Sequence, residues 1–347
     1  MMAEEWPIAA PQPERAAEPA RDAGADRLRV VMSDFFLDPD QRLTEQERAL
    51  MSFMLANLLD LIADEIRSAL PAPDAANDGN GRALVKALAG VGLLRHPPLI
   101  ALLLRRADEE RIATAVRARS SGYPIFIQSL IGHSDGQVSA AAMDLILGRG
   151  RRRNALGQLQ LDFDDVPADV AAPLAYAVAA TLRGEALYGS TPERVDRELA
   201  AAAATFLVRH DEGRSIDAVM AALVRALAAV GRLDEPLLNA AAEEGDLAFL
   251  AEALAQLAGV DVSTAWDHLV HGVDGRAVLL LKMAGVSRTF AAGVLVQLGD
   301  LLGIADPVSE VDRFDGLELQ QAWQEQERLR LDPAYKSALA AIGTSSG

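Results

Sequence analysis

The sequence predicts an all-α protein, a multi-helix array of HEAT-like or α-solenoid character without significant β-sheet. Ala supplies 65 and Leu 50 of the 347 residues, and both are strong helix formers. Aromatic residues, which favour strands, make up only 5%. Apolar side chains also recur at three- and four-residue spacing in many short segments, as stacked helix pairs require, although no strict sequence period is found.

The clearest helix signal lies at 44–70. Thr44 and Glu47 form the Thr-x-x-Glu pattern of a capping box, and a long apolar stripe follows until Pro71. The stripe is wide for a helix with one wet face. The helix should therefore pack against neighbours on two sides or against a second subunit in a homodimer. The candidate dimer or partner residues are Met51, Met54, Leu55 and Leu58.

Short helices are expected before and after this segment, several of them opened by a proline or an acidic or hydroxyl cap. In the first half of the chain they are expected at 28–36, 84–91, 98–104, 108–116, 124–131 and 135–146. The pattern breaks at 149–166. Helices then resume at Pro167 and Pro192, and are expected at 216–230, 247–257, 266–270, 278–283 and 290–302.

These elements suggest four regions. Residues 1–26 are rich in Ala, Pro and Glu and are expected to form a disordered tail. An N-terminal helical region (27–190) and a C-terminal helical region packed on it (191–305) follow. The last region, 306–347, is charged and is expected to be partly helical.

Composition and charge exclude several classes of protein. Lys and Arg total 33 and Asp and Glu total 50, so the formal net charge is −17, which disfavours binding to nucleic acid. Cysteine is absent, which excludes disulfides and zinc sites built from thiolates. No signal peptide is visible and charges interrupt the most apolar stretch, 278–304. We therefore expect a cytoplasmic protein without a membrane span.

Several stretches resemble a bacterial family of uncharacterised helical proteins, known as domain of unknown function 2336. They are RLTEQERALMSFMLANLLDLIADEIRSAL (42–70), LLRHPPLIALLLRRADEERIATAVRARS (93–120), VSAAAMDLILGRGRRR (138–153), GDLAFLAEALAQLAGVD (245–261) and GRAVLLLKMAGVSRTFAAGVL (275–295). The resemblance spans roughly 42–300 and implies an all-helical, repeat-like bacterial protein. The family has no established activity, so the resemblance transfers no functional residue.

An arginine cluster is the sharpest local anomaly in this acidic chain. The candidate anion- or partner-binding residues are Arg149, Arg151, Arg152 and Arg153, with Arg105 and Arg106 upstream. Guanidinium groups suit carboxylate or phosphate recognition. The alternative, which charge runs favour in general, is that these arginines pair with neighbouring Asp and Glu or cap helix ends.

Two further groups have the residue types of a metal site. His268 and His271 lie three residues apart beside Asp267, but no third ligand is identifiable, which favours ordinary helix histidines. Asp162, Asp164 and Asp165 are clustered without a calcium-loop pattern, which favours a solvated acidic loop. We predict no metal and no cofactor.

No motif of a hydrolase, a phosphate-binding loop or a dinucleotide site is found. We therefore expect an interaction, scaffold or regulatory adaptor protein that binds a protein or peptide partner through helical surfaces. The alternative is a sensor of a small anionic or phosphorylated ligand that uses the arginine cluster. An enzyme whose site carries no recognisable motif stays a third reading.

Overall fold

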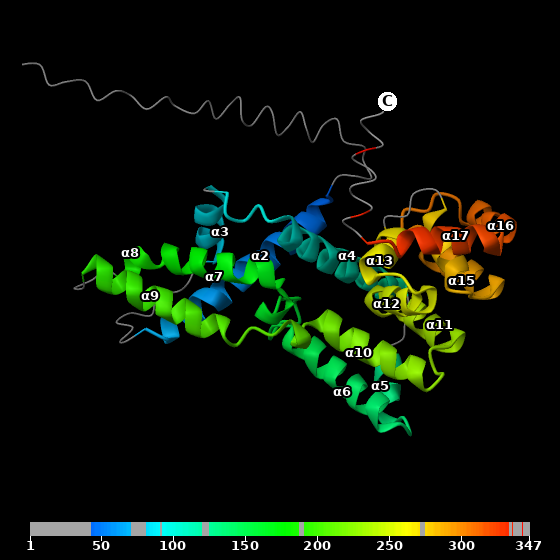
Figure 1. The fold of residues 1–347 in the computed structure, drawn as a ribbon, viewed down its shortest axis with the longest axis horizontal. Helices are drawn as coiled ribbons and strands as arrows, with labels where there is room; N and C mark the ends of the chain where they lie inside the picture. The colour runs from blue at the N-terminus through cyan, green and yellow to red at the C-terminus, as the bar shows by residue number, and fades with distance from the viewer. Residues whose placement is uncertain are drawn as a thin grey trace, which may run out of the picture. The chain divides into compact units, whose positions relative to one another are not determined.

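The computed structural model describes residues 43–70, 81–90, 92–119, 125–186, 191–270 and 275–332, together with Tyr335 and Ile342 (Figure 1). Within these residues the structure is helical, apart from one isolated bridge between Arg153 and Leu159. The predicted all-α class is confirmed at this level. The chain divides into two compact units, Met1–Thr44 and Glu45–Gly347, and the described helices all belong to the second.

The described helices include most of the predicted ones. In the first half of the unit they are α2 (Glu45–Ser68), α3 (Gly81–Gly90), α4 (Pro97–Arg119), α5 (Phe126–Ser129), α6 (Gly136–Arg151), α7 (Ala168–Thr181), α8 (Arg183–Ala186) and α9 (Pro192–Leu207). In the second half they are α10 (Ile216–Ala229), α11 (Glu235–Glu244), α12 (Leu247–Ala258), α13 (Val262–Val270), α14 (Arg276–Met283), α15 (Arg288–Leu298), α16 (Pro307–Gly316) and α17 (Leu319–Leu329). Short 3-10 turns are η2 (Leu130–Gly132), η3 (Phe163–Asp165) and η4 (Glu212–Arg214).

Apolar side chains form two separate hydrophobic cores. The first core draws on α2, α3, the first half of α4, residues 161–166, α7 and α9. The second core draws on the second half of α4, on α5 and α6, and on the helices from α10 to α17. Removing this apolar surface from water is the main force that holds short helices in place.

Helix α4 belongs to both cores. Leu99 and Leu103 are buried in the first core, whereas Ile112 and Val116 are buried in the second. The sequence suggested two helices here, with Asp108 capping the second, and this prediction is wrong. Asp108 lies inside one continuous helix, where it is buried and Arg111 lies 3.5 Å away.

Helix α2 packs within its own chain on both sides. It contacts α3 and α4 and also α7 and α9 (Figure 1). Met54 and Leu58 are fully buried and Leu55 is nearly so, while Met51 packs half-buried against the same core. The expectation that these four residues form a dimer or partner surface is therefore wrong for the three buried ones. The wide stripe serves the first core.

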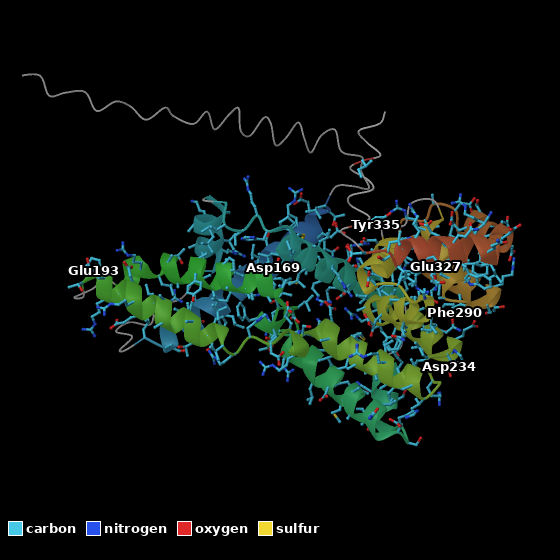
Figure 2. The ribbon with its side chains drawn as sticks, viewed as in Figure 1. Asp169, Glu193, Asp234, Phe290, Glu327 and Tyr335 are labelled. Carbon is cyan, nitrogen blue, oxygen red and sulfur yellow. The ribbon has the colours of Figure 1, made fainter. Side chains whose placement is uncertain are left out.

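Capping side chains begin several helices where the sequence indicates them. Asp135 accepts a hydrogen bond from the backbone N–H of Gln137 at the start of α6, as predicted. Asp234, labelled in Figure 2, accepts one from Leu237 at the start of α11, a helix that the sequence reading missed. Such caps stabilise a helix by about 1 kcal/mol each.

No single helix among the described residues has the length and apolar composition needed to cross a bilayer. Only α12 and α13 taken together meet those requirements, and the chain bends by 118° between them. Both helices bury apolar side chains in the second core.

Some predictions fall on residues outside those that the structure describes. They are the tail at 1–26, the helix at 28–36, His271, and most of the segment after Asp332. The four-region division and the HEAT-like arrangement stay predictions.

Candidate functional site

A cavity of about 340 Å³ lies where α4, α6 and α10 meet the turn between α11 and α12. This volume is at the lower end of the range of small-molecule sites. Part of the wall is apolar and includes Ile127, Ile146, Leu159, Leu161 and Met220. The rest is charged and contains five arginines: Arg106, Arg117, Arg149, Arg152 and Arg153.

Arg152 directly follows α6 and is buried, as is Arg106. Its Nε and Nη2 donate to the two carboxylate oxygens of Asp165 at 2.7 and 2.6 Å. The side chains of the two residues are only 5% and 0% exposed. A paired guanidinium and carboxylate of this geometry is strong and directional, so it fixes the cavity floor.

Arg106 is the second buried arginine. It donates to both oxygens of Glu109 at 2.8 Å, and its Nη2 lies 2.7 Å from Asp217 of α10. Burial disfavours the charge of Asp217, but attraction to Arg106 and then Arg105 outweighs it and lowers the pKa of Asp217. Arg106, in turn, has a raised pKa despite its burial. Both groups therefore stay ionised.

Arg117 and Arg153 share one carboxylate at the rim of the cavity. Glu110 lies 3.3 Å from Arg117 Nη2, and its two oxygens lie 3.3 and 2.6 Å from the terminal nitrogens of Arg153. The side chains of Arg117 and Arg153 are 40% and 37% exposed. They are therefore accessible from solvent, unlike Arg106 and Arg152.

Arg149 completes the rim from α6. Its Nη2 lies 2.6 Å from Asp246, whose other oxygen caps α12 through the Phe249 N–H. Glu244, on the same wall, accepts hydrogen bonds from the backbone N–H groups of Ile125 and Phe126.

The structure thus brings together four of the six predicted arginines. Arg106, Arg149, Arg152 and Arg153 line the cavity. Arg105 lies beside it, where it pairs with Glu109 and Asp217 and stacks over Trp266 at 5.0 Å. Arg151 is exposed and does not line it.

Arg117 is a cavity arginine that lies outside the six candidates. No motif in the sequence marks its position. The continuous helix α4 explains why Arg117 lines the cavity. Residues at three- or four-residue spacing share one helix face, and this face carries Arg106, Glu110, Ala113 and Arg117.

The acidic group at 162–165 is not the solvated loop that the sequence favours. Asp164 and Asp165 are buried. Asp165 holds Arg152 and accepts from the Ile216 N–H, and Asp164 accepts from both Nε and Nη2 of Arg214. Their charges are matched by cations and backbone amides, which is how buried carboxylates persist.

His268 is also a structural residue. Its Nδ1 lies 2.8 Å from the carbonyl oxygen of Thr264, and burial lowers its pKa. Among the described residues, no group of three or more His, Asp and Glu side chains is arranged to hold a metal ion.

The fold and the site define an all-helical protein with a small, arginine-lined cavity between its helices. The chain belongs to the family described as an uncharacterised protein conserved in bacteria (DUF2336), whose model matches residues 105–328. This match begins in the middle of α4 and includes all five arginines of the cavity, but not α2 and α3. No curated protein and no solved structure matches the chain.

Proposed function

We propose that this chain is a regulatory binding protein that senses a small anionic or phosphorylated ligand in the arginine-lined cavity. One observation carries the proposal: five arginines from α4 and from α6 and the residues that follow it line the same concave space. Guanidinium groups bind the oxygens of phosphates and carboxylates through paired N–H donors.

The five arginines divide into two sets. Arg106 and Arg152 are buried in tight pairs with Asp217 and Asp165, and they hold the wall together. Arg117, Arg149 and Arg153 line the cavity and have side chains that are 37–40% exposed. We assign ligand recognition to this second set, the rim arginines.

The side chains of the cavity wall favour ligand binding over catalysis. Its carboxylates pair with arginines or accept from backbone N–H groups, so they hold the wall together. Groups held in this way are suited to shaping a site.

The proposal is tested by measuring thermal unfolding with phenyl phosphate as the probe. Ligand at 100 times Kd stabilises a folded protein by about 2.7 kcal/mol. Arg153→Gln removes charged hydrogen bonds worth about 1.5–3 kcal/mol, so we expect at least about tenfold weaker binding. Arg149→Gln should weaken binding in the same direction.

Arg151→Gln is the matched control, because Arg151 lies two residues away, is exposed, and does not line the cavity. It should bind the probe as the wild type does. Equal losses in Arg151→Gln and Arg153→Gln would contradict the proposal. A replacement of Arg152 is not informative, because it breaks a buried pair and unfolds the wall.

A second candidate function is the adaptor role, in which helical surfaces bind a protein partner or a second copy of the chain. It is favoured by Leu319 and Trp323, one turn apart on α17 and 51% and 58% exposed. We keep HEAT-like stacking as part of this candidate. If it is correct, replacing both residues with Ser abolishes recovery of a partner that the wild type captures, and leaves phenyl phosphate binding unchanged.

A further inference from the structure

We infer that Glu110 occupies the place of the ligand's anionic group and is displaced from Arg117 and Arg153 when the ligand binds. This inference rests on the proposed function and specifies how the site works. Glu110 would be a built-in competitor that sets the affinity of the cavity for anions.

The geometry of Glu110 is that of a bound oxyanion. One of its oxygens lies 3.3 Å from Arg117 Nη2 and 3.3 Å from Arg153 Nη1, and the other lies 2.6 Å from Arg153 Nη2. Two guanidinium groups, one inside α4 and one just after α6, thus converge on a single carboxylate. A phosphate or a ligand carboxylate fits between two arginines in the same way.

The local charges leave this carboxylate outnumbered. Arg117 and Arg153 carry two positive charges, and Glu110 is the one carboxylate among the described residues that pairs with either of them. Their neutral partners are the Thr114 hydroxyl, which accepts from Arg117, and the Gly157 carbonyl oxygen, which accepts from Arg153. The other carboxylates of the wall are engaged elsewhere: Glu109 and Asp217 with Arg105 and Arg106, Asp165 with Arg152, Asp246 with Arg149, and Glu244 with two backbone amides. An incoming anion is therefore attracted to this pair of arginines first.

Glu110 is also held by fewer kinds of partner than Asp165, Asp246 and Glu244 are. Within the described part of the chain it accepts hydrogen bonds from these two arginines and from no backbone N–H. Asp165, Asp246 and Glu244 each hold a backbone amide as well, so displacing them would leave a buried donor unsatisfied. Glu110 needs only to rotate toward solvent, since its side chain is already 19% exposed.

The class of ligand follows from the rest of the wall. The apolar side chains of Ile127, Ile146 and Met220 line the same cavity. We infer a ligand with one phosphate or carboxylate group on an apolar body. The anionic group would meet the rim arginines and the body would fill the cavity.

The test is titration calorimetry of the full chain with phenyl phosphate and with inorganic phosphate. Glu110→Gln removes the competing charge and keeps the side-chain size, so we expect about tenfold tighter binding of phenyl phosphate than in the wild type. Glu110→Ala should give the same direction. Glu198→Gln is the matched control, because Glu198 pairs with Arg194 on α9 at 2.7 Å and does not line the cavity.

The outcomes separate this inference from the proposed function. Unchanged or weaker binding in both Glu110 variants, with measurable binding by the wild type, overturns the inference and leaves the proposed function standing. No binding by the wild type or by either variant overturns both. If inorganic phosphate binds as tightly as phenyl phosphate, the inference that the ligand has an apolar body is overturned. Tighter binding in both variants, with the Glu198 control unchanged, supports the inference.

Discussion

Glu252 on α12 is a carboxyl group whose charge the fold disfavours. Burial raises its pKa above 4.5, and the attraction of Arg105 only partly offsets this because Asp217 lies nearby as well. A raised pKa means that the folded state binds the proton more tightly than the unfolded state. The resulting stability is present at low pH and is lost as the pH rises through the pKa of the folded state.

We therefore predict that Glu252→Gln gains stability relative to the wild type as the pH rises. The amide keeps its neutral form at every pH, whereas the wild-type carboxyl must ionise in a half-buried position. Urea unfolding at pH about 4 and about 7 should show a larger advantage of the variant at the higher pH. Glu327→Gln, at an exposed site on α17, is the control. An advantage that is the same at both values would contradict the argument.

At this scale the sequence identifies residue types but not their partners. Arginines in an acidic chain stand out, and four of the six candidates do line one cavity. What the sequence cannot supply is the carboxylate that each one meets, since Arg153 pairs with Glu110, 43 residues away. The same limit explains why the acidic group at 162–165 was expected in solvent.

At the scale of the element, a glycine ends α11 and lines the cavity at that point. Gly245 ends α11 with a positive φ of 71°, and a Cβ built there would lie 2.8 Å from Val116 Cβ on α4. Gly231 also has a positive φ, 66°, but no atom lies within 4 Å of such a Cβ. The two glycines thus share a positive φ, but only Gly245 lies close to another helix.

We predict that Gly245→Ala is more destabilising than Gly231→Ala. The positive φ costs about 1–2 kcal/mol for alanine at either site, and only Gly245→Ala adds a clash with α4. Thermal unfolding of the two variants measures the difference. If they lose equal stability, α4 yields to the added methyl group and the close packing at this turn is unimportant.

Element boundaries were predictable where a cap or a proline marks them. Asp135 before α6 and Pro192 at the first position of α9 lie where the sequence places them. The predicted division of α4 at Asp108 was wrong because an aspartate can begin a helix but can also lie inside one when its charge has a partner. The run Arg-Arg-Ala-Asp-Glu-Glu-Arg at 105–111 lies between the two cores, so its charges find partners instead of ending the helix.

At the scale of the whole described unit, a polar junction joins the two cores. The turn at 162–165 follows Leu161 of the first core, and it holds the turn at 211–216 that leads into α10 of the second core. Asp165 is central here, because it binds Arg152 and the Ile216 N–H together.

We predict that Asp165→Asn destabilises the protein by about 3–5 kcal/mol, the usual cost of leaving a buried charge without its partner. Asp196→Asn, in the exposed pair with Arg183, should leave the unfolding midpoint nearly unchanged. Chemical denaturation of both variants tests this. A small loss in Asp165→Asn would mean that water reaches Arg152 and compensates its charge.

The fold class was predictable from composition, because a third of the chain is Ala and Leu and the apolar spacing is helical. The arrangement was not. Contacts such as α2 with α9 join helices far apart in the sequence, and helical periodicity carries no information about which stripes meet. The cavity lies at such a meeting place, which is why its wall could not be assembled from the sequence.

The division into two cores also bears on the order in which the chain can fold during its synthesis on the ribosome. All buried side chains of the first core lie at or before Phe206, whereas the second core needs residues as late as Ala322. The N-terminal core can therefore condense while synthesis continues, and the apolar surface of α12 must wait for α13 and α14 to emerge. We therefore expect nascent chains to pass through a stage in which the first core is complete and the apolar face of α12 is still uncovered, and at that stage a chaperone would protect the chain from aggregation.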